Sequence, residues 1–592
     1  MNSEEPQTLP RMLRKLWRHI GRRRRSQLIA VGILMLLTTG LELVSIGAIL
    51  PFLGALSSPE KLFADPRAEK LIHSLGIVQP DQLLFPLTLL FSMAVVLSAS
   101  ARIVLLWVQT RFGFAVGADL GAEVYRRTLY QSYAIHISRN SSEIIAGIMN
   151  KVGSLVFIAI QPVLNLVSAS LILVSVVSLL LLIEPLVSAV TYLGFSMIYV
   201  VTSRLSKRQL LRDGQHVTRE QNQLLKALQE GLGGIRDIII GGTQEAYLRV
   251  FQEADRKLRR SSANIAIIGG VPRYAIEAVA TVLIAIVAYV MVHRAGGMEA
   301  TIPVLGALAL GAQRVLPLLQ QIYHSVTAMR GGKAVLADAL ALLSQPMPSP
   351  QTSAGDSIVP FDQAITLRDL KFRYSIETSW VLKGVDLDIP RGARLGLVGV
   401  TGSGKSTLID ILMGLISPTQ GTLMVDGQEI DQSTCRAWQK HIAHVPQTIF
   451  LADATISENI AFGVPKSEVD HQRVRLAAER AQIADTIGKW KDGYGTVVGE
   501  RGVRLSGGQR QRIGIARALY KSADVIVFDE ATSALDGETE EAVMAAINSL
   551  DRDLTIIVVA HRLSSLKECD RIVELGDGTI KKYGTYKDLY GT

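Results

Sequence analysis

The sequence predicts a multidomain chain: an all-α transmembrane domain of six helices, followed by a soluble α/β domain. The chain has 592 residues, of which 48% are hydrophobic and only 19% are charged. It is therefore too long and too apolar to be one ordinary soluble domain. Apolar segments of membrane-spanning length all lie before residue 330. After a proline-rich linker, short apolar strands alternate with helical stretches, as in an α/β protein.

Six segments are long enough to span a bilayer. A span takes about 20 predominantly apolar residues, because lipid forces each helix to satisfy its own backbone polar groups. The six segments are 27–56, 83–108, 153–182, 185–203, 264–293 and 302–326. Two long polar stretches, after the second and the fourth segments, are basic and therefore cytoplasmic by the positive-inside rule. We expect them to continue the membrane helices beyond the bilayer.

Basic residues precede the first apolar segment. The net charge of +9 would allow a nucleic-acid partner, but the run Arg22 to Arg25 directly before an apolar segment favours the anionic inner leaflet, and we expect no nucleic acid. The apolar run 27–56 is far longer than the roughly 7–15 residues of a signal peptide, which favours a retained helix with a cytoplasmic N-terminus. Residues 10–21 fit an interfacial amphipathic helix, with a disordered basic tail as the alternative.

The linker marks the boundary between the two domains. The hexapeptide QPMPSP at 345–350 cannot hold a helix. We expect a basic interfacial helix at 1–26, the transmembrane domain at 27–343, the linker at 344–362 and the α/β domain at 363–592. Cys435 and Cys569 lack metal-ligand or disulfide spacing and are typical of reduced cytosolic thiols, so the C-terminus is also expected in the cytoplasm.

A glycine-rich loop predicts nucleotide binding. The octapeptide GVTGSGKS at 399–406 follows an apolar strand and precedes a helical stretch, where backbone N–H groups turn toward phosphates at a helix N-terminus. Lys405 adds a positive charge at the terminal phosphates, and the Ser406 hydroxyl can bind Mg²⁺. We therefore expect a P-loop NTPase nucleotide-binding domain with ATP and Mg²⁺ as cofactors. The expected nucleotide-binding residues in this loop are Gly399, Thr401, Gly402, Ser403, Gly404, Lys405, Ser406 and Thr407.

Two acids follow a second buried strand. The apolar run 525–528 ends at Asp529 and Glu530. A carboxylate at such a strand end can hold Mg²⁺, and its neighbour can polarise the attacking water. We assign Asp529 to the metal and Glu530 to the general base. The alternative, two solvated loop acids, is disfavoured by the strand and by the phosphate loop upstream.

The pentapeptide LSGGQ at 505–509 matches the ABC signature, and the chain resembles the ABC transporter superfamily in the order and spacing of its motifs. The resemblance implies that Tyr374 stacks on adenine, that Gln447 binds Mg²⁺ and links the site to the membrane domain, and that His561 contacts the γ-phosphate. It places Asp536 at a dimer seam.

The same resemblance implies a homodimer. Ser506 and Gly508 of one chain would complete the ATP site of a second copy, so one membrane domain with one ATPase domain is half a transporter. Both acids and the signature are intact, which implies two equivalent competent sites. The sequence GERG at 499–502 resembles a loop by which exporters touch the membrane domain. The segments 135–143 and 234–242 would transmit ATP-driven closure to the membrane helices.

Three arginines inside the membrane helices are candidates for substrate binding. Intramembrane charges are costly and therefore informative, and guanidinium groups suit phosphate. Arg102, Arg273 and Arg314 would favour a lipid-linked anionic substrate with a headgroup such as a diphosphate. Arg273 has Glu277 four residues on, so mutual neutralisation is an equal alternative. Arg314 has no acid at helical spacing, which favours a functional role.

The membrane half resembles bacterial flippases for lipid-linked oligosaccharides that supply protein glycosylation. The resemblance lies in ELVSIG at 42–47, SRNSSE at 138–143, PRY at 272–274 and a long external stretch at 57–82. It implies translocation of a polyprenyl-diphosphate glycan across the bacterial inner membrane. Alternatives are an exporter of lipid A, another glycolipid or a hydrophobic compound. An ATP-gated channel or regulator is a different class, which an intact Glu530 disfavours.

Overall fold

The computed structural model describes residues 8–57, 59–63, 79–139, 144–145, 147–183, 185–292, 297–347, 359–530, 537–560 and 562–591. The chain divides into two compact units, which are described separately. The helical unit comprises Met1–Gln131 and His136–Met347. The α/β unit comprises Ser132–Ile135 and Pro348–Thr592.

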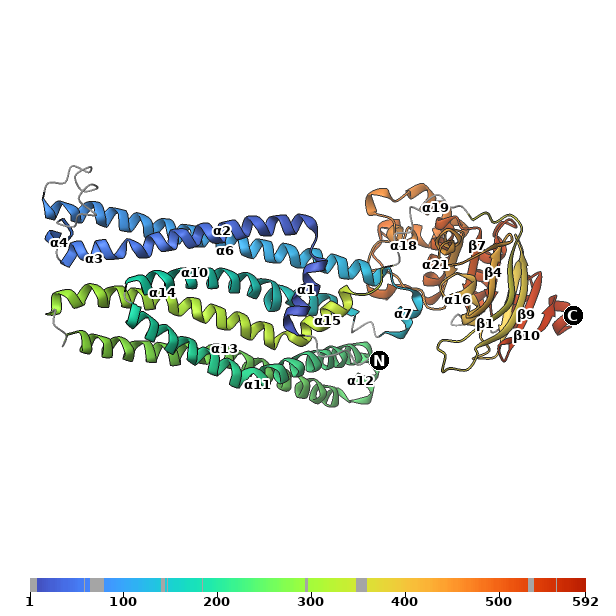
Figure 1. Cartoon of the computed structure of the whole chain (residues 1–592). Helices are drawn as coiled ribbons and strands as arrows, with labels where there is room; N and C mark the ends of the chain where they lie inside the picture. The colour runs from blue at the N-terminus through green and yellow to red at the C-terminus, as the bar shows by residue number, and fades with distance from the viewer. Residues whose placement is uncertain are drawn as a thin grey trace. The chain divides into compact units, whose positions relative to one another are not determined.

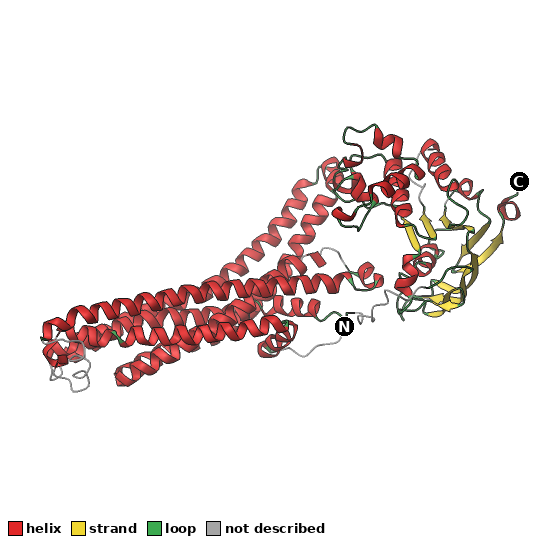
Figure 2. Cartoon of the chain, turned by 90° about the horizontal axis from the view of Figure 1, so that it is seen from above, coloured by secondary structure: helices red, strands yellow, loops and turns green. Residues whose placement is uncertain are grey.

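The helical unit consists of long helices that run side by side (Figures 1 and 2). In chain order its elements are α1 (Leu9–His19), α2 (Arg22–Gly47), α3 (Ile49–Ser57), α4 (Pro59–Phe63), η1 (Pro80–Leu83), α6 (Leu84–Leu129), η2 (Gly147–Val152), α9 (Gly153–Leu155), η3 (Val156–Ile160), α10 (Gln161–Ile183), α11 (Pro185–Gly233), α12 (Ile235–Gly241), α13 (Gln244–Val292), α14 (Gly297–Gly331) and α15 (Lys333–Leu343). Helix α7 (Tyr133–Ser138) is divided between the two units after Ile135. Helix α2 packs on α6, α10 on α14, and α11 on α13.

The described part of each of the six expected segments is helical. The first is divided at Ala48 into α2 and α3, and the third contains the π-helical turn η3, with a second such turn, η2, directly before it. Among the described residues, three stretches are long and apolar enough to cross a membrane: Arg22–Leu56, Leu84–Leu129 and Gly147–Leu182. Helix α6 has 46 residues, about twice what a bilayer requires, so its polar end continues the apolar part as expected.

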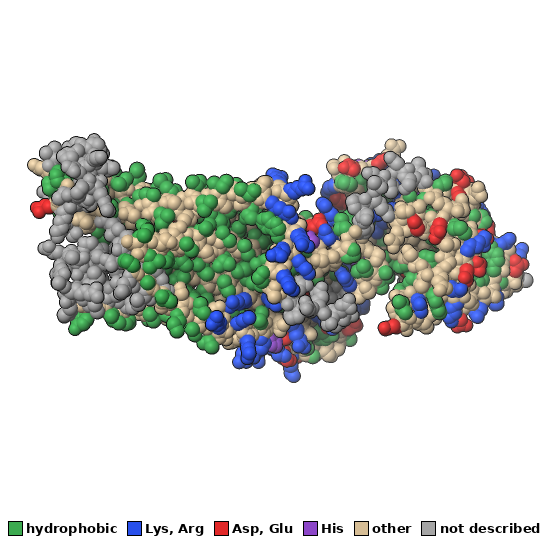
Figure 3. All heavy atoms as spheres, in the orientation of Figure 1, with side chains coloured by type: hydrophobic (Ala, Val, Ile, Leu, Met, Phe, Trp, Pro, Cys, Tyr) green, Lys and Arg blue, Asp and Glu red, His purple; other side chains and the backbone are tan. Residues whose placement is uncertain are grey.

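The surface of the helical unit is apolar along the helices and basic at one end (Figure 3). Leu89 of α6 is 60% exposed and Trp107 is 62% exposed. Such exposure of large apolar side chains is unfavourable in water but not in lipid. Helix α1 packs through Met12 and Leu16, both buried, so this segment is a helix and not a disordered tail, while its position at the membrane interface stays a prediction. Of the long external stretch expected at 57–82, the structure describes residues 57, 59–63 and 79–82, and residues 58 and 64–78 lie outside the described part of the chain.

The α/β unit contains two sheets. A four-stranded antiparallel sheet has the order β2-β1-β4-β5, and a six-stranded sheet has the order β10-β9-β3-β8-β7-β6, parallel except for β10. The strands are β1 (Ala364–Phe372), β2 (Leu382–Pro390), β3 (Arg394–Gly399), β4 (Gln420–Val425), β5 (Gln428–Glu429), β6 (Ile442–Val445), β7 (Val525–Asp529), β8 (Thr555–Val559), β9 (Arg571–Gly576) and β10 (Thr579–Gly584). The expected α/β class is confirmed.

Helices cover the sheets and complete two hydrophobic cores. They are α16 (Lys405–Leu412), α17 (Cys435–Lys440), α18 (Ile456–Ile460), α19 (His471–Arg480), α20 (Ala484–Gly488), α21 (Gly507–Lys521), α22 (Gly537–Asn548) and α23 (Tyr586–Tyr590), with short 3₁₀ turns η4 (Lys466–Glu468), η5 (Gly493–Gly495), η6 (Glu500–Gly502) and η7 (Leu563–Leu566). Strands β7 and β8 are apolar and buried nearly throughout, as a parallel sheet covered on both faces requires. Because β3 and β7 flank β8 and all three are parallel, their carboxyl ends meet at one edge of the sheet.

Candidate functional site

The loop after β3 is shaped by glycines. Gly399, Gly402 and Gly404 have φ values of 152°, 84° and 101°, which side-chain-bearing residues rarely adopt. A Cβ atom at Gly399 would lie 2.3 Å from the carbonyl oxygen of Leu575. The loop therefore turns tightly into α16, and its backbone N–H groups gather at the N-terminus of that helix.

Lys405 and Ser403 give this loop its polar character. Lys405 Nζ donates to the carbonyl oxygens of Gly399 at 2.6 Å and Val400 at 3.1 Å. Burial lowers the pKa of Lys405, while the carboxylates of Glu530 and Asp529 oppose that shift. The Ser403 hydroxyl is buried and has no hydrogen-bond partner within the described chain. A buried hydroxyl of this kind suits a phosphate oxygen, so the loop fits a nucleotide.

The two acids lie at the end of β7. Glu530 has a φ of 49°, and its N–H donates to the Val559 carbonyl at 3.1 Å. Gln447 Nε2 donates to the Glu530 carboxylate at 2.7 Å, and the Gln447 carbonyl accepts a bond of 3.1 Å from Gln511. The left-handed backbone of Glu530 costs of order 1 kcal/mol, which is typical of a position constrained by function. The structure thus brings Gln447 and Glu530 together.

A third carboxylate lies near Asp529. Asp410 of α16 is half-buried, and burial with the nearby charge of Asp529 raises its pKa to about 6. Sequence reasoning missed Asp410, because the pattern of the phosphate loop ends before it. The available signal was an acid among the apolar residues 408–412.

Tyr374 lies against the start of α16. Its hydroxyl is 3.2 Å from Thr407 Oγ1, and its ring meets Phe372 edge-on at 5.0 Å. The side chain is 56% exposed, so one ring face is open. Thr401 and Ser406 of the loop are also exposed, so both side chains are accessible to a ligand.

The signature residues lie at the N-terminus of α21. Ser506 caps this 15-residue helix through a reciprocal hydrogen-bond pair with Gln509. Ser506 is exposed and Gly508 is buried. Among the described residues, the hydroxyl of Ser506 bonds to Gln509, and Ser506 makes no bond to the phosphate loop. His561 and Asp536 lie outside the described residues.

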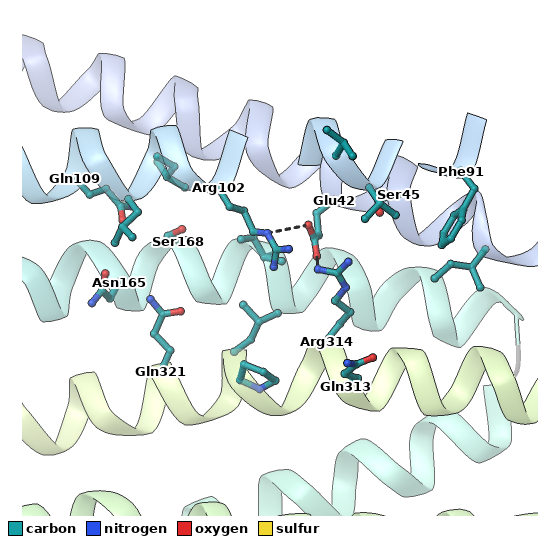
Figure 4. A pocket seen from close by; sticks show the side chains of 18 of the residues that line it. Glu42, Ser45, Phe91, Arg102, Gln109, Asn165, Ser168, Gln313, Arg314 and Gln321 are labelled. Carbon is teal, nitrogen blue, oxygen red and sulfur yellow. Dashed lines mark ion pairs between the residues drawn. The ribbon is translucent and has the colours of Figure 1, made fainter. Parts of the chain in front are cut away.

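The helical unit contains a cavity of about 750 Å³. Side chains of α2, α3, α6, α10 and α14 line it (Figure 4). Arg314 Nη1 lies 3.1 Å from Glu42 Oε1, and Arg102 Nε lies 3.6 Å from Glu42 Oε2. The Ser98 hydroxyl also donates to Glu42. Two of the three arginines singled out in the sequence are thus brought to one carboxylate.

These contacts correct one argument about Arg314. Its lack of an acid at helical spacing favoured function, but the structure pairs it with Glu42 from another helix. Arg273 does not line the cavity; its guanidinium lies 6.0 Å from the ring centre of Tyr274. Arg273 and Glu277 are both described, and no ion pair joins them. Glu42 was missed as a site residue, although a single acid within an apolar run was the available signal.

Both units of the chain match known protein families. Residues 28–313 match the family model of the ABC transporter transmembrane region, and residues 382–533 match that of the ABC transporter. The ATP-dependent lipid A-core flippase of Chromohalobacter salexigens is 31% identical over 473 residues, covering 79% of this chain and 80% of the relative. The chain belongs to the ABC transporter family.

Two further relatives refine this assignment. The ATP-dependent lipid A-core flippase of Ralstonia nicotianae is 29% identical over 474 residues, or 80% of this chain and 79% of the relative. The structure of a bacterial Atm1-family ABC exporter with ATP bound has the same fold, with a TM-score of 0.78, 24% identity and coverage of 95% and 96% of the two chains. This ABC transporter is therefore an exporter-type half-transporter. It is a multi-pass membrane protein whose ATPase is coupled to transport.

Proposed function

We propose that this ABC transporter is a homodimeric flippase that uses ATP to move a phosphate-bearing glycolipid of the lipid A class across the bacterial inner membrane, with both termini in the cytoplasm. The observation that carries the proposal is the pair Arg102 and Arg314 in the cavity of the helical unit. Guanidinium groups bind phosphate through paired hydrogen bonds. The lipid A-core flippases among its relatives support this class of substrate over the lipid-linked oligosaccharide expected first.

A polyprenyl-diphosphate glycan is the second candidate. It also carries phosphate on a lipid, so the same arginines would serve it. The resemblance of 42–47 and 272–274 to oligosaccharide flippases favours it. Arg273, at the second of these segments, lies outside the cavity lining, so the argument for this candidate is weaker.

The residues of the α/β unit explain how ATP would be bound and cleaved. The N–H groups of the glycine loop and the ammonium group of Lys405 would hold the phosphates, and the open face of Tyr374 would stack on adenine. Glu530, oriented by Gln447, would accept the proton of the attacking water. Mg²⁺, when bound, would neutralise phosphate charge. The Ser406 hydroxyl, the Gln447 amide oxygen and the Asp529 carboxylate are oxygen donors suited to hold it. His561 would contact the γ-phosphate.

A second copy of the chain would complete each site. Ser506 is exposed at the N-terminus of a long helix, where backbone N–H groups favour an anion. We infer that Ser506 and Gly508 contact the ATP bound by the partner copy, so that two ATP molecules close the dimer. The segments 135–143 and 234–242 would transmit this closure, and hydrolysis would reverse it. ATP can shift the helices only as far as it prefers the closed state.

Reconstituted transport tests the proposal. Full-length protein in liposomes receives ATP and one of three labelled lipids: a lipid A-type glycolipid, a polyprenyl-diphosphate glycan and a neutral glycolipid. We expect ATP-dependent movement of the first and little of the neutral lipid. Movement of the second alone would transfer the assignment to the oligosaccharide class. Movement of the neutral lipid alone would contradict a role for phosphate.

A further inference from the structure

One buried carboxylate holds both arginines of the cavity. Glu42 of α2 is 2% exposed, and its two oxygens face Arg314, Arg102 and the Ser98 hydroxyl. Figure 4 shows the two guanidinium groups converging on this carboxylate from different helices. The carboxylate therefore lies where an anionic ligand of these arginines would also have to bind.

The charges of the cavity do not balance. Among the described residues that line it, Arg102 and Arg314 contribute +2 and Glu42 contributes −1, which leaves +1. The other polar lining residues are neutral: Ser45, Ser92, Gln109, Asn165, Ser168, Gln313 and Gln321. A positive charge that is not compensated in an apolar helix bundle is costly, so this excess favours one further negative charge.

The arginines remain accessible although Glu42 is not. The side chain of Arg102 is 43% exposed and that of Arg314 is 24% exposed, against 3% for Glu42. Each guanidinium has five N–H donors and uses only part of them here. The 3.6 Å separation between Arg102 and Glu42 is longer than a hydrogen bond, so Arg102 is the more weakly held of the two.

We propose that Glu42 is an internal counter-ion that competes with the substrate's phosphate for Arg102 and Arg314, and so sets the affinity of the cavity for anionic lipids. This deepens the proposed function and rests on it for the nature of the substrate. Without substrate, Glu42 offsets one of the two positive charges and holds α2, α6 and α14 together. When a phosphate enters, the arginines turn to it, and repulsion between the phosphate and Glu42 weakens binding.

Binding to the full-length protein in a neutral detergent tests this role. The probe is a fluorescent short-chain phosphatidic acid, and phosphatidylcholine with the same chains, a zwitterion without net charge, is the control. We expect Glu42→Gln to tighten binding of phosphatidic acid about 10-fold and to leave phosphatidylcholine unchanged. Adding Arg314→Gln to Glu42→Gln should remove the gain. Glu42→Asp, which keeps the charge but shortens its reach, should tighten binding by a smaller factor.

Several results would overturn the role of Glu42. One is that Glu42→Gln binds phosphatidic acid as tightly as the wild type or more weakly. Another is that Glu42→Gln binds both lipids more tightly by the same factor. If Glu42→Gln does not fold, as judged by thermal unfolding, Glu42→Asp decides, and binding equal to wild type is then the contrary result. Transport of the lipid A-type glycolipid by the wild type, measured in parallel, separates the two proposals. Transport without tightening removes only the role of Glu42, whereas tightening without transport removes only the proposed function.

Discussion

Gln447 donates a hydrogen bond of 2.7 Å to the carboxylate of Glu530, and this bond joins the end of the sheet to the segment after β6. The bond restrains the orientation of the Glu530 carboxylate. The left-handed φ of 49° at Glu530 further restricts where that carboxylate lies. The carboxylate proposed as the general base is therefore fixed both by a side-chain hydrogen bond and by its own backbone conformation.

Replacing Glu530 with Gln removes the expected base but keeps the shape and the contact with Gln447. We expect ATP hydrolysis to fall by about 100-fold or more, the usual contribution of a general base. ATP binding should persist, and the dimer should remain closed. The measurements are phosphate release and retention of labelled ATP after gel filtration. Turnover equal to wild type would remove Glu530 from this role.

Complementation between two inactive variants tests the shared site. In Ser506→Arg a bulky charge blocks the partner's ATP, and in Glu530→Gln the base is lost, so each homodimer should be inactive. A mixed dimer has one site with the intact base of the Ser506→Arg chain and the intact signature of the Glu530→Gln chain. We expect purified mixed dimers, carrying two different tags, to hydrolyse ATP at least about 10-fold faster than either homodimer.

The same experiment has a clear contrary result. If each chain used its own signature, every site in the mixed dimer would carry one defect, and no activity would return. The two parental homodimers, purified through the same tags, are the matched controls.

Arg314→Ala tests the cavity. Loss of the guanidinium leaves Glu42 buried with only Arg102, so we expect transport of the phosphate-bearing lipid to fall by about 10-fold. ATP hydrolysis should fall much less, because Arg314 belongs to the helical unit. Arg273→Ala is the matched control, since Arg273 lies outside the cavity lining, and we expect transport close to wild type. Equal losses of transport and hydrolysis in Arg314→Ala would indicate a structural role.

The sequence predicted the sites that lie within one continuous segment, and it missed the contacts between side chains from distant segments. The phosphate loop at 399–406 and the pair Asp529 and Glu530 follow strands whose composition is evident, so both the fold and the site could be inferred there. Glu42, Arg102 and Arg314 come from three helices, and nothing in their spacing shows that they meet. Helical periodicity finds partners three or four residues away and cannot find one on another helix.

Asp410 makes the stability of the α/β unit depend on pH. Its pKa in the folded state is about 6, above the ordinary value of 3.8, because of burial and the charge of Asp529. The folded state therefore binds the proton of this carboxyl group more tightly than the unfolded state does. The ionised Asp410 lowers the free energy of unfolding, fully above pH 6, and this destabilisation vanishes as the pH falls toward 4. Asp410→Asn keeps the side chain neutral at every pH, so it should stabilise the protein at pH 8 and leave stability at pH 4 unchanged.

The expected stabilisation by Asp410→Asn at pH 8 is modest. A shift of this kind corresponds to about 3 kcal/mol, and because solvent reaches part of the side chain we expect about 1 kcal/mol, or about 3 °C. Tryptophan fluorescence during heating measures it, since Trp380, Trp438 and Trp490 all lie in this unit. Asp388→Asn, at an exposed acid of β2, is the matched control and should show no stabilisation at pH 8. Stabilisation of Asp410→Asn that is equal at pH 4 and pH 8 would contradict a titration effect.

Gly214 sets the distance between α11 and α14. A Cβ atom at this position would lie 2.0 Å from the carbonyl oxygen of Gly331, so Gly214→Ala must push the two helices apart. Lost packing should cost about 1–3 kcal/mol, more than the gain of up to about 1 kcal/mol in helix propensity. We expect the apparent Tm in detergent to fall by several degrees. Gly121→Ala in α6 is the matched control, because no described atom lies within 4 Å of the added methyl group, and its Tm should match or exceed wild type. Equal Tm values for the two variants would show that the contact at Gly214 relaxes without cost.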